Sequence, residues 1–198
     1  MRVWVIPDPH WYHNAMVHLC GRPENHTQLS IANWKVRVSD GDMVIVLGDV
    51  IFKEISKLRS ILNGLPGNKI LVSGNHDKQP DPWYRNAGFM VVVNHLRWGC
   101  LWLTHKPEQE LPTGCEWNIC GHVHNNDYTT IALHDRLEFR DWHLVLALEQ
   151  MEYSPQPLDE IVGGRWHRRD LIPGNESNTG NHIRTIDRAI VLMGGQSE

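Results

Sequence analysis

Short apolar runs and polar turns alternate along the first half of the chain. Residues 3–6, "VWVI", form the first run, residues 43–49, "MVIVLGD", the second, and residues 69–72, "KILV", the third. Runs of this length that are rich in β-branched residues are typical of strands buried on both faces of a sheet. We therefore predict three buried strands in this half of the chain.

Between these runs, apolar positions recur at helical spacing. Residues 27–38, "TQLSIANWKVRV", predict one helix, and residues 51–62 predict a second. The sequence "NGLPG" at 63–67 ends the second helix, because glycine and proline do not continue it. "PDPWYRNAG" at 80–88 predicts a further helical turn that begins near a proline.

After residue 88 the pattern changes to one strand after another. These strands are predicted at 89–93, 98–105, 116–122, 137–140 and 143–149. Alternating strands and helices followed by successive strands predict a layered α/β or α+β sandwich rather than a doubly wound sheet. Residues 1–161 are expected to form one domain. The polar, glycine-rich residues 162–198 are expected to form a partly flexible C-terminal extension.

Composition and charge are those of an ordinary globular protein. Of the 198 residues, 41% are hydrophobic and 21% charged, which allows a substantial core. The formal net charge of −4 gives no broad attraction to nucleic acid or to an anionic membrane. No apolar run approaches the length of a membrane span, the N-terminus lacks the features of a signal peptide, and the cysteines form no CxxC pair. A cytoplasmic protein without membrane contact is the resulting expectation.

Five of the predicted strands end at side chains that can bind a metal ion. In chain order these are Asp8 with His10, Asp49, Asn75, His105, and His122 with His124. Because ligands of open α/β sheets bind outside the carboxyl ends of the strands, groups that are remote in sequence can meet there. Carboxylates, imidazoles and an amide, with no thiolate among them, suit Mn, Fe or Zn.

This ligand set has the chemistry of a centre for two metal ions. The positive charge of two divalent ions exceeds the negative charge of Asp8, Asp49 and a bridging hydroxide. The centre keeps a net charge of about +1, which suits a phosphate ester. Such ions can hold both a nucleophile and a phosphoryl oxygen, and they acidify bound water so that hydroxide exists near neutral pH. The residues therefore favour hydrolysis of a phosphate ester.

The motifs "DPH", "GD", "GNHD", a later histidine and "GHVH" stand in the order, and near the spacing, of the calcineurin-like metallophosphoesterases. From Met1 to about Ile161 the sequence resembles this family. The early "DPHWYH" and the late "HLVLALEQMEYSPQPLDEIV" look most like its small single-domain branch in bacteria and their phages. The resemblance implies an α/β (α+β) fold, a four-layer sandwich in which two mixed β-sheets are flanked by helices.

The resemblance also implies a role for each motif residue. One metal would be held by Asp8, His10 and His124, and the second by Asn75, His105 and His122, with Asp49 bridging the two. His76 would stand beside the scissile phosphate and protonate the leaving oxygen or stabilise the developing charge, and Asp77 would orient His76. Gly48 and Gly74 would let the backbone turn sharply beside the ions.

Residues next to these motifs add two expectations. Pro7 and Pro9 flank Asp8, where a small hydroxylic residue is commoner in the family. Since proline lacks a backbone N–H, we expect one hydrogen bond near the first metal to be missing. His13, three residues after His10, is a candidate for contact with a substrate phosphate or leaving group.

The predicted function is dimetal-dependent hydrolysis of a phosphate mono- or diester by direct attack of a metal-bridging hydroxide. Mn²⁺ is the first candidate ion, with Fe and Zn as alternatives. Few insertions are present that could build a deep pocket, so the site should be open. The substrate should be small, such as a nucleotide or a cyclic nucleotide phosphodiester. The sequence predicts no particular oligomeric state.

Two other interpretations stay open. A nuclease or a nucleic-acid end-processing phosphatase would use the same chemistry, but it needs a basic groove and binding that weakens steeply with salt. Nucleic acid is therefore not the favoured partner of this acidic chain. A metal-dependent binding scaffold would keep the fold without turnover, and the complete ligand set argues against it.

Overall fold

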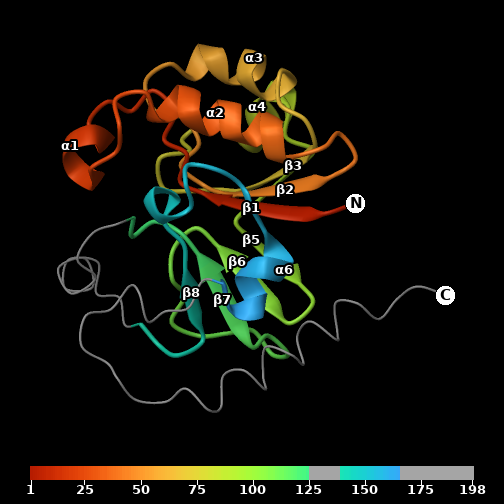
Figure 1. Cartoon of the computed structure of the whole chain (residues 1–198). Helices are drawn as coiled ribbons and strands as arrows, with labels where there is room; N and C mark the ends of the chain where they lie inside the picture. The colour runs from red at the N-terminus through yellow and green to blue at the C-terminus, as the bar shows by residue number, and fades with distance from the viewer. Residues whose placement is uncertain (125–138, 166–198) are drawn as a thin grey trace.

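Two β-sheets that pack face to face and are flanked by helices form the frame of the molecule (Figure 1). The structure is a computed structural model, and it describes residues 1–124 and 139–165. Within these residues both sheets are mixed, because each combines parallel and antiparallel pairs. The expectation of an α/β fold with two mixed sheets flanked by helices is therefore confirmed.

The first sheet has the strand order β4-β3-β2-β1-β9, and its first four strands are parallel. The parallel strands are β1 (Val3–Pro7), β2 (Met43–Leu47), β3 (Asn68–Val72) and β4 (Val91–Val93). The last strand, β9 (Gln156–Pro157), pairs antiparallel with β1. The three strands predicted from apolar runs are thus neighbours in space, and their carboxyl ends lie at one edge of the sheet.

Helices connect these strands and cover one face of the sheet. They are α1 (Met16–Cys20), α2 (His26–Arg37), η1 (Ile55–Lys57), α3 (Leu58–Asn63) and α4 (Asp81–Ala87). Figure 1 shows α2, α3 and α4 on the same side of the strands. The helix predicted over residues 27–38 is confirmed as α2.

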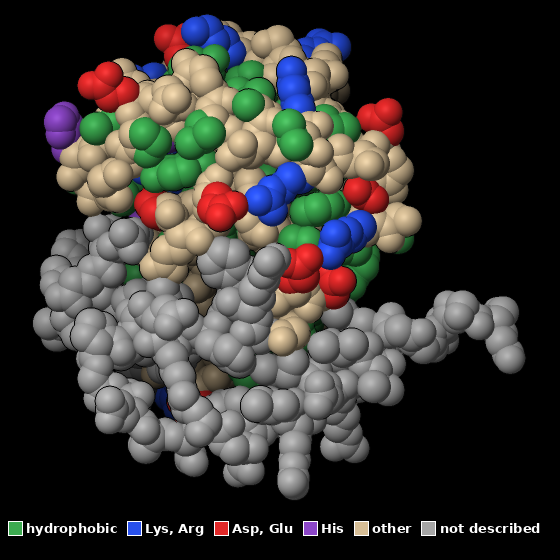
Figure 2. Space-filling model, viewed as in Figure 1, with side chains coloured by type: hydrophobic (Ala, Val, Ile, Leu, Met, Phe, Trp, Pro, Cys, Tyr) green, Lys and Arg blue, Asp and Glu red, His purple; other side chains and the backbone are tan. Residues whose placement is uncertain are grey.

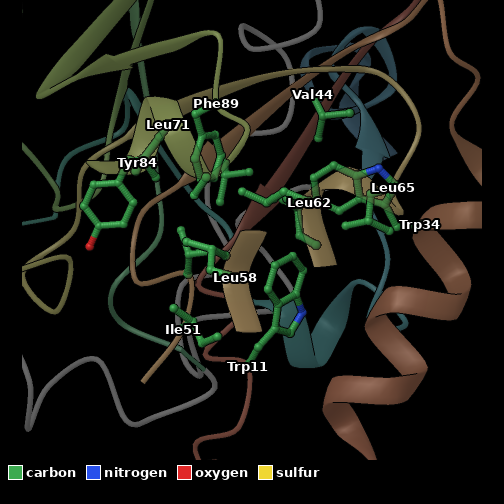
Figure 3. Packing of buried hydrophobic residues seen from close by; sticks show 14 of the residues in the cluster. Trp11, Trp34, Val44, Ile51, Leu58, Leu62, Leu65, Leu71, Tyr84 and Phe89 are labelled. Carbon is green, nitrogen blue, oxygen red and sulfur yellow. The ribbon is translucent and has the colours of Figure 1, made fainter. Parts of the chain in front are cut away.

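Large apolar side chains fill the space between the helices and this sheet (Figure 3). Trp34 of α2 and Leu62 of α3 are at most 1% exposed, and they share a cluster with Val44 and Leu71 of the sheet. Trp11 is also fully buried in this cluster. Because Trp11 follows the first predicted ligands, its burial anchors their loop to the helical layer.

The second sheet has the order β5-β6-β7-β8. Its strands are β5 (His95–Trp98), β6 (Leu101–Thr104), β7 (Trp117–Cys120) and β8 (His143–Val145). The strand predicted over 98–105 is present as β6 but begins only at Leu101, because Trp98 ends β5 and pairs with Leu101 in a hairpin. Gly99 supplies the left-handed φ of 61° that this two-residue turn needs.

Apolar side chains of both sheets meet in a second core. Ile45 of the first sheet and Leu103 of the second are fully buried in it. Two short helices, α6 (Leu158–Glu160) and η3 (Ile161–Arg165), follow β9, and their Leu158, Ile161 and Val162 are buried in the same cluster. Residues 166–198 lie outside the described residues, so the C-terminal extension stays a prediction.

Two further boundaries differ from expectation, and a third lies partly outside the described residues. The helix predicted from Ile51 begins at Ile55, because Ile51 forms a parallel bridge with Trp11 that continues the pairing of β1 and β2. The strand predicted over 143–149 ends at Val145, and the 3₁₀ helix η2 (Leu148–Gln150) follows. Residues 137–138 of the strand predicted at 137–140 lie outside the described residues.

The helices of the described ranges are all too short or too polar to cross a membrane. On the face drawn in Figure 2, Lys and Arg side chains lie among Asp and Glu side chains over the helical layer. The described side chains therefore form no basic patch on this face.

Replacing Leu62 with alanine should lower the free energy of unfolding by about 2–5 kcal/mol, because the change leaves a cavity between α3 and the sheet. Urea-induced unfolding followed by circular dichroism measures this loss. Val36→Ala on α2 is the control, since Val36 is 86% exposed, and it should change the free energy by less than about 0.5 kcal/mol. Equal effects of the two substitutions would contradict the described packing.

Candidate metal centre

Five strands deliver the predicted ligands to one place. Asp8 follows β1 directly, and Asp49 lies just beyond β2. Asn75 follows β3, His105 follows β6 and His122 follows β7, so both sheets contribute. The site forms because parallel pairing aligns the carboxyl ends of these strands within each sheet.

Two groups of three predicted ligands each hold their ligand atoms within 4.8 Å of one another. The first group is Asp8, His10 and His124, and the second is Asp49, His105 and His122. The groups adjoin, because His105 Nδ1 lies 3.3 Å from Asp8 Oδ1 and Asp49 Oδ2 lies 3.4 Å from His10 Nε2. The sequence predicts Asn75 rather than Asp49 as the third member of the second set, with Asp49 between the two sets. Asn75 Oδ1 lies 2.7 Å from His105 Nε2, and ligation itself stays a prediction.

Two buried atoms of the first group have no hydrogen-bond partner among the described residues. They are Oδ1 of Asp8 and Nε2 of His10, on side chains that are at most 3% exposed. A buried polar atom without a partner costs about 1–3 kcal/mol. A cation beside these two atoms would satisfy both, so the group fits a metal ion.

His105 gives a second indication of a cation. Its Nδ1 lies 2.9 Å from the carbonyl oxygen of Leu47, and burial lowers the pKa of His105, so the ring is neutral and Nδ1 donates. Its Nε2 then carries a lone pair, yet it lies 2.7 Å from Oδ1 of Asn75, which is another acceptor. Two acceptors this close are compatible when both face one cation.

The charges of the site also favour a cation. Burial raises the pKa of Asp8, and the nearby charge of Asp49 raises it further. Burial lowers the pKa of His10 to about 3, so this ring is neutral near pH 7. Neutral histidines cannot compensate two buried carboxylates, whereas a divalent ion can hold both in the ionised state.

Glycines leave the space that the carboxylates occupy. A Cβ atom on Gly74 would overlap the Asp49 side chain, and a Cβ atom on Gly121 would overlap the Asp8 side chain. Gly48 has a left-handed φ of 76°, and a Cβ atom there would lie 2.6 Å from Gly74 Cα. The backbone therefore approaches the site more closely than any other residue type would allow.

The backbone is strained at the ligands themselves. Five predicted ligands have a positive φ, namely Asp8 (44°), His10 (46°), Asp49 (51°), His122 (70°) and His124 (53°). This conformation costs about 1–3 kcal/mol at each residue that carries a Cβ atom. Hydrogen bonds to the carboxylates hold it in place, because Asp8 Oδ2 accepts the N–H of His122 and Asp49 Oδ1 accepts that of His76, both at 2.8 Å.

Asp77 ties two loops of the site together. Its Oδ2 accepts the N–H groups of Asp49 and Gly74, both at 2.8 Å, and its Oδ1 accepts that of Val50 at 3.1 Å. The loop after β2 is thereby fastened to the loop after β3, which carries His76. The predicted orientation of His76 by Asp77 would act through this loop, and it stays a prediction.

The site opens to solvent at His76, whose side chain is 42% exposed and whose Nε2 lies 4.0 Å from Asp49 Oδ2. His13 lies beside it, with Nδ1 3.2 Å from Nδ1 of His10. The His13 ring stacks on Phe52 with ring centroids 3.8 Å apart. Phe52 is 37% exposed and meets the His76 ring edge-on at 5.5 Å. An aromatic wall therefore borders the open side.

Three residues at the site were not expected from the sequence, namely Arg22, Phe52 and Glu149. Arg22 Nε donates to Glu149 Oε1 at 2.7 Å, and both side chains are at most 4% exposed. Burial raises the pKa of Glu149, but its hydrogen bond with His124 and the charge of Arg22 outweigh burial and lower the pKa to about 2. The only sequence feature that could have indicated Glu149 is that it is an acidic residue inside the apolar stretch "VLALEQM".

The prolines beside Asp8 leave their carbonyl groups available, and Arg22 uses one of them. Its guanidinium donates to the carbonyl oxygens of Asp8 at 3.0 Å and of Pro9 at 2.9 Å. Pro9 has no N–H group to donate, as expected, but the buried guanidinium of Arg22 supplies other hydrogen bonds to this loop.

Comparisons with known proteins show the fold more clearly than the activity. No family model matches the chain. Over 172 residues the chain is 27% identical to the uncharacterized protein MJ1445 of Methanocaldococcus jannaschii, and the match covers 81% of this chain and 89% of that protein. The sequence therefore extends over most of the length of this relative.

Two solved structures are similar to this one. A protein of unknown function from Aquifex aeolicus, AQ665, has a TM-score of 0.62 and 23% identity, over 81% of this chain and 97% of its own. The nuclease MPE of Pseudomonas putida has a TM-score of 0.46 and 20% identity, over 62% of each chain. The first likeness shows a shared fold, and the second is too weak to support a conclusion about activity.

The metal-free protein should bind two Mn²⁺ ions per chain, as counted by isothermal titration calorimetry, and should unfold at a higher temperature when they bind. Gly121→Ala should weaken this binding, because the added methyl group displaces the Asp8 carboxylate.

Gly41→Ala is the matched control, since a Cβ atom at Gly41 meets nothing within 4 Å. It should leave the number and affinity of the bound ions unchanged. Wild-type binding by Gly121→Ala would show that Asp8 holds no ion.

Proposed function

We propose that this chain is a calcineurin-like metallophosphoesterase that hydrolyses a small phosphate mono- or diester. The proposal includes the four-layer sandwich of that family, with which the described helices and mixed sheets are compatible. Two divalent ions would be its cofactors, with Mn²⁺ first and Fe or Zn as alternatives. Its partner would be the small ester itself rather than a membrane.

The observation that supports this function best is the meeting of two ligand groups at Asp49. Divalent ions bound by them would polarise a phosphoryl oxygen and supply a nucleophile from water. The chain contributes a preset ligand frame, because strained backbone, glycines and backbone hydrogen bonds fix the side chains before anything binds. Little rearrangement should therefore accompany binding.

His76 would move the proton of the leaving group. Its backbone N–H donates to Asp49 Oδ1, which fixes the loop beside the metal centre, while its ring remains exposed. A ring at this position can give a proton to an ester oxygen on the open side of the site. Asp77 would position His76 by holding the loop that carries it.

The substrate would carry a flat group, as a nucleotide does. Phe52 and His13 form a stacked pair beside His76, and Phe52 exposes part of its ring. An exposed aromatic ring next to a phosphate site offers a surface on which a base can stack. A nucleotide or cyclic nucleotide diester is therefore our first substrate class.

His76→Ala should keep both metal ions yet lose about 10²–10⁴-fold in turnover of bis(p-nitrophenyl) phosphate with Mn²⁺, the range typical of a lost proton donor. Steady-state kinetics and calorimetric ion counts on the same preparation measure the two properties. Loss of a bound ion in this variant would show instead that His76 is a metal ligand.

Asp49→Asn separates the enzyme from a binding scaffold. An enzyme should lose activity in this variant, because Asp49 belongs to the second ligand group and lies 3.4 Å from His10 of the first, whereas a scaffold should keep its partner. Wild-type protein without activity on a panel of mono- and diesters with Mn²⁺, Fe²⁺ and Zn²⁺ would refute the proposal. A nuclease would instead show binding that falls steeply with salt.

Phe52→Ala should raise the KM for thymidine 5′-p-nitrophenyl phosphate, because stacking on one base is worth about 1–3 kcal/mol. The KM for methyl p-nitrophenyl phosphate, which has no base, should not change. Ile55→Ala removes a similarly exposed side chain on η1, at 39% exposure, and should affect neither substrate. A parallel change for both esters in Phe52→Ala would exclude a stacking role.

A further inference from the structure

A buried ion pair lies directly behind the first ligand group. Arg22 follows the short helix α1, and Glu149 lies in η2, so the pair joins parts of the chain that are far apart in sequence. The Arg22 side chain is 0% exposed and the Glu149 side chain 4%. A buried pair of this kind requires specific partners for all its groups, because removing two charges from water is costly.

Besides Glu149, the partners of Arg22 are two residues of the first ligand group and the proline beside Asp8. Its guanidinium donates to the carbonyl oxygens of Asp8 and Pro9, and one of its nitrogens lies 3.3 Å from Nδ1 of His124. These contacts fix the backbone on which Asp8 stands. They act on a residue whose φ of 44° is strained, so the loop needs such support.

Glu149 approaches the same histidine. Its Oε1 lies 3.5 Å from His124 Nδ1, while its Oε2 is buried without a hydrogen-bond partner among the described residues. A histidine that binds a metal through one nitrogen usually donates the other N–H to a carboxylate, which fixes the ring and makes the ligand more basic. Nε2 of His124 is free for an ion only in the tautomer that carries the proton on Nδ1. In that tautomer Glu149 Oε1 accepts the Nδ1 proton, while Arg22 Nη2, which can only donate, keeps its hydrogen bond to the carbonyl oxygen of Asp8.

We propose that Arg22 and Glu149 are a positioning pair that orients His124 and the Asp8 loop toward one metal ion. The inference rests on the proposed metal centre, since it assigns the pair to the ion of Asp8, His10 and His124. The pair adds no net charge to the site, so it can direct these ligands without opposing the binding of a cation.

A rival role for Glu149 is that of a metal ligand, because Cys20, His124 and Glu149 also bring ligand atoms within 4.8 Å of one another. The guanidinium of Arg22 argues against it. Its Nε lies 2.7 Å from the carboxylate oxygen, and a cation bound there would face this positive charge. The number of bound ions distinguishes the two roles.

The test is Glu149→Gln, which keeps the size of the side chain and removes its charge. Mn²⁺ binding measured by calorimetry should show two ions per chain, with the affinity for one of them reduced by about 10–100-fold. The kcat for a phosphodiester should return to near the wild-type value when Mn²⁺ is raised to saturation, because the reacting groups are unchanged.

Glu160→Gln is the matched control, since Glu160 pairs with Arg2 at 2.8 Å on the surface. It should bind both ions as the wild type does. If Glu149→Gln unfolds, Arg22→Met combined with Glu149→Gln leaves no unpaired buried charge and should show the same selective loss of affinity.

Two results would overturn the inference. Wild-type affinity for both ions, with only a lower melting temperature of the metal-free protein, would make the pair merely structural. Loss of one bound ion at saturating Mn²⁺ would make Glu149 a ligand. Failure of the wild-type protein to bind Mn²⁺ would instead refute the proposed function, so the two hypotheses fail separately.

Discussion

Two carboxylates buried between two apolar cores determine how the rest of the molecule is built. Asp8 is fully buried and Asp49 is 2% exposed, and the histidines between them stay neutral when buried. Such a cluster is most stable when its charge is compensated, because burial penalises the ionised form of each carboxyl group. The fold thus places buried negative charge at the edge where the strands of both sheets end. A divalent cation would compensate this charge.

Bringing these side chains together requires backbone conformations that helices and strands do not contain. The strands stop just before the ligands, and the following residues turn through left-handed conformations that Gly48 and Gly74 make possible at close range. Asp77 then joins two of these loops through three backbone N–H groups. The cost of the strained turns is offset by the cores on either side, which hold the strand ends at fixed positions.

The candidate ligands could be located from the sequence because each follows an apolar run, and a run identifies both a strand and its end. That they bind a metal stays a prediction. Arg22 and Glu149 could not be predicted in this way, since their roles depend on a contact across 127 positions of the chain. Phe52 was missed for a related reason, because only its stacking on His13 gives it a place at the site. The hairpin at Gly99 was hidden by apolar residues on both sides of the turn.

The pairing of β1 with β9 has a consequence for how the chain is made. Val5 pairs with Gln156, so the strand that leads into Asp8 has an open hydrogen-bonding edge until the chain has been synthesised almost to Leu158. An open edge of this kind can pair with another molecule. A growing or truncated polypeptide that ends before β9 would therefore leave this edge of its first strand available for pairing with another molecule.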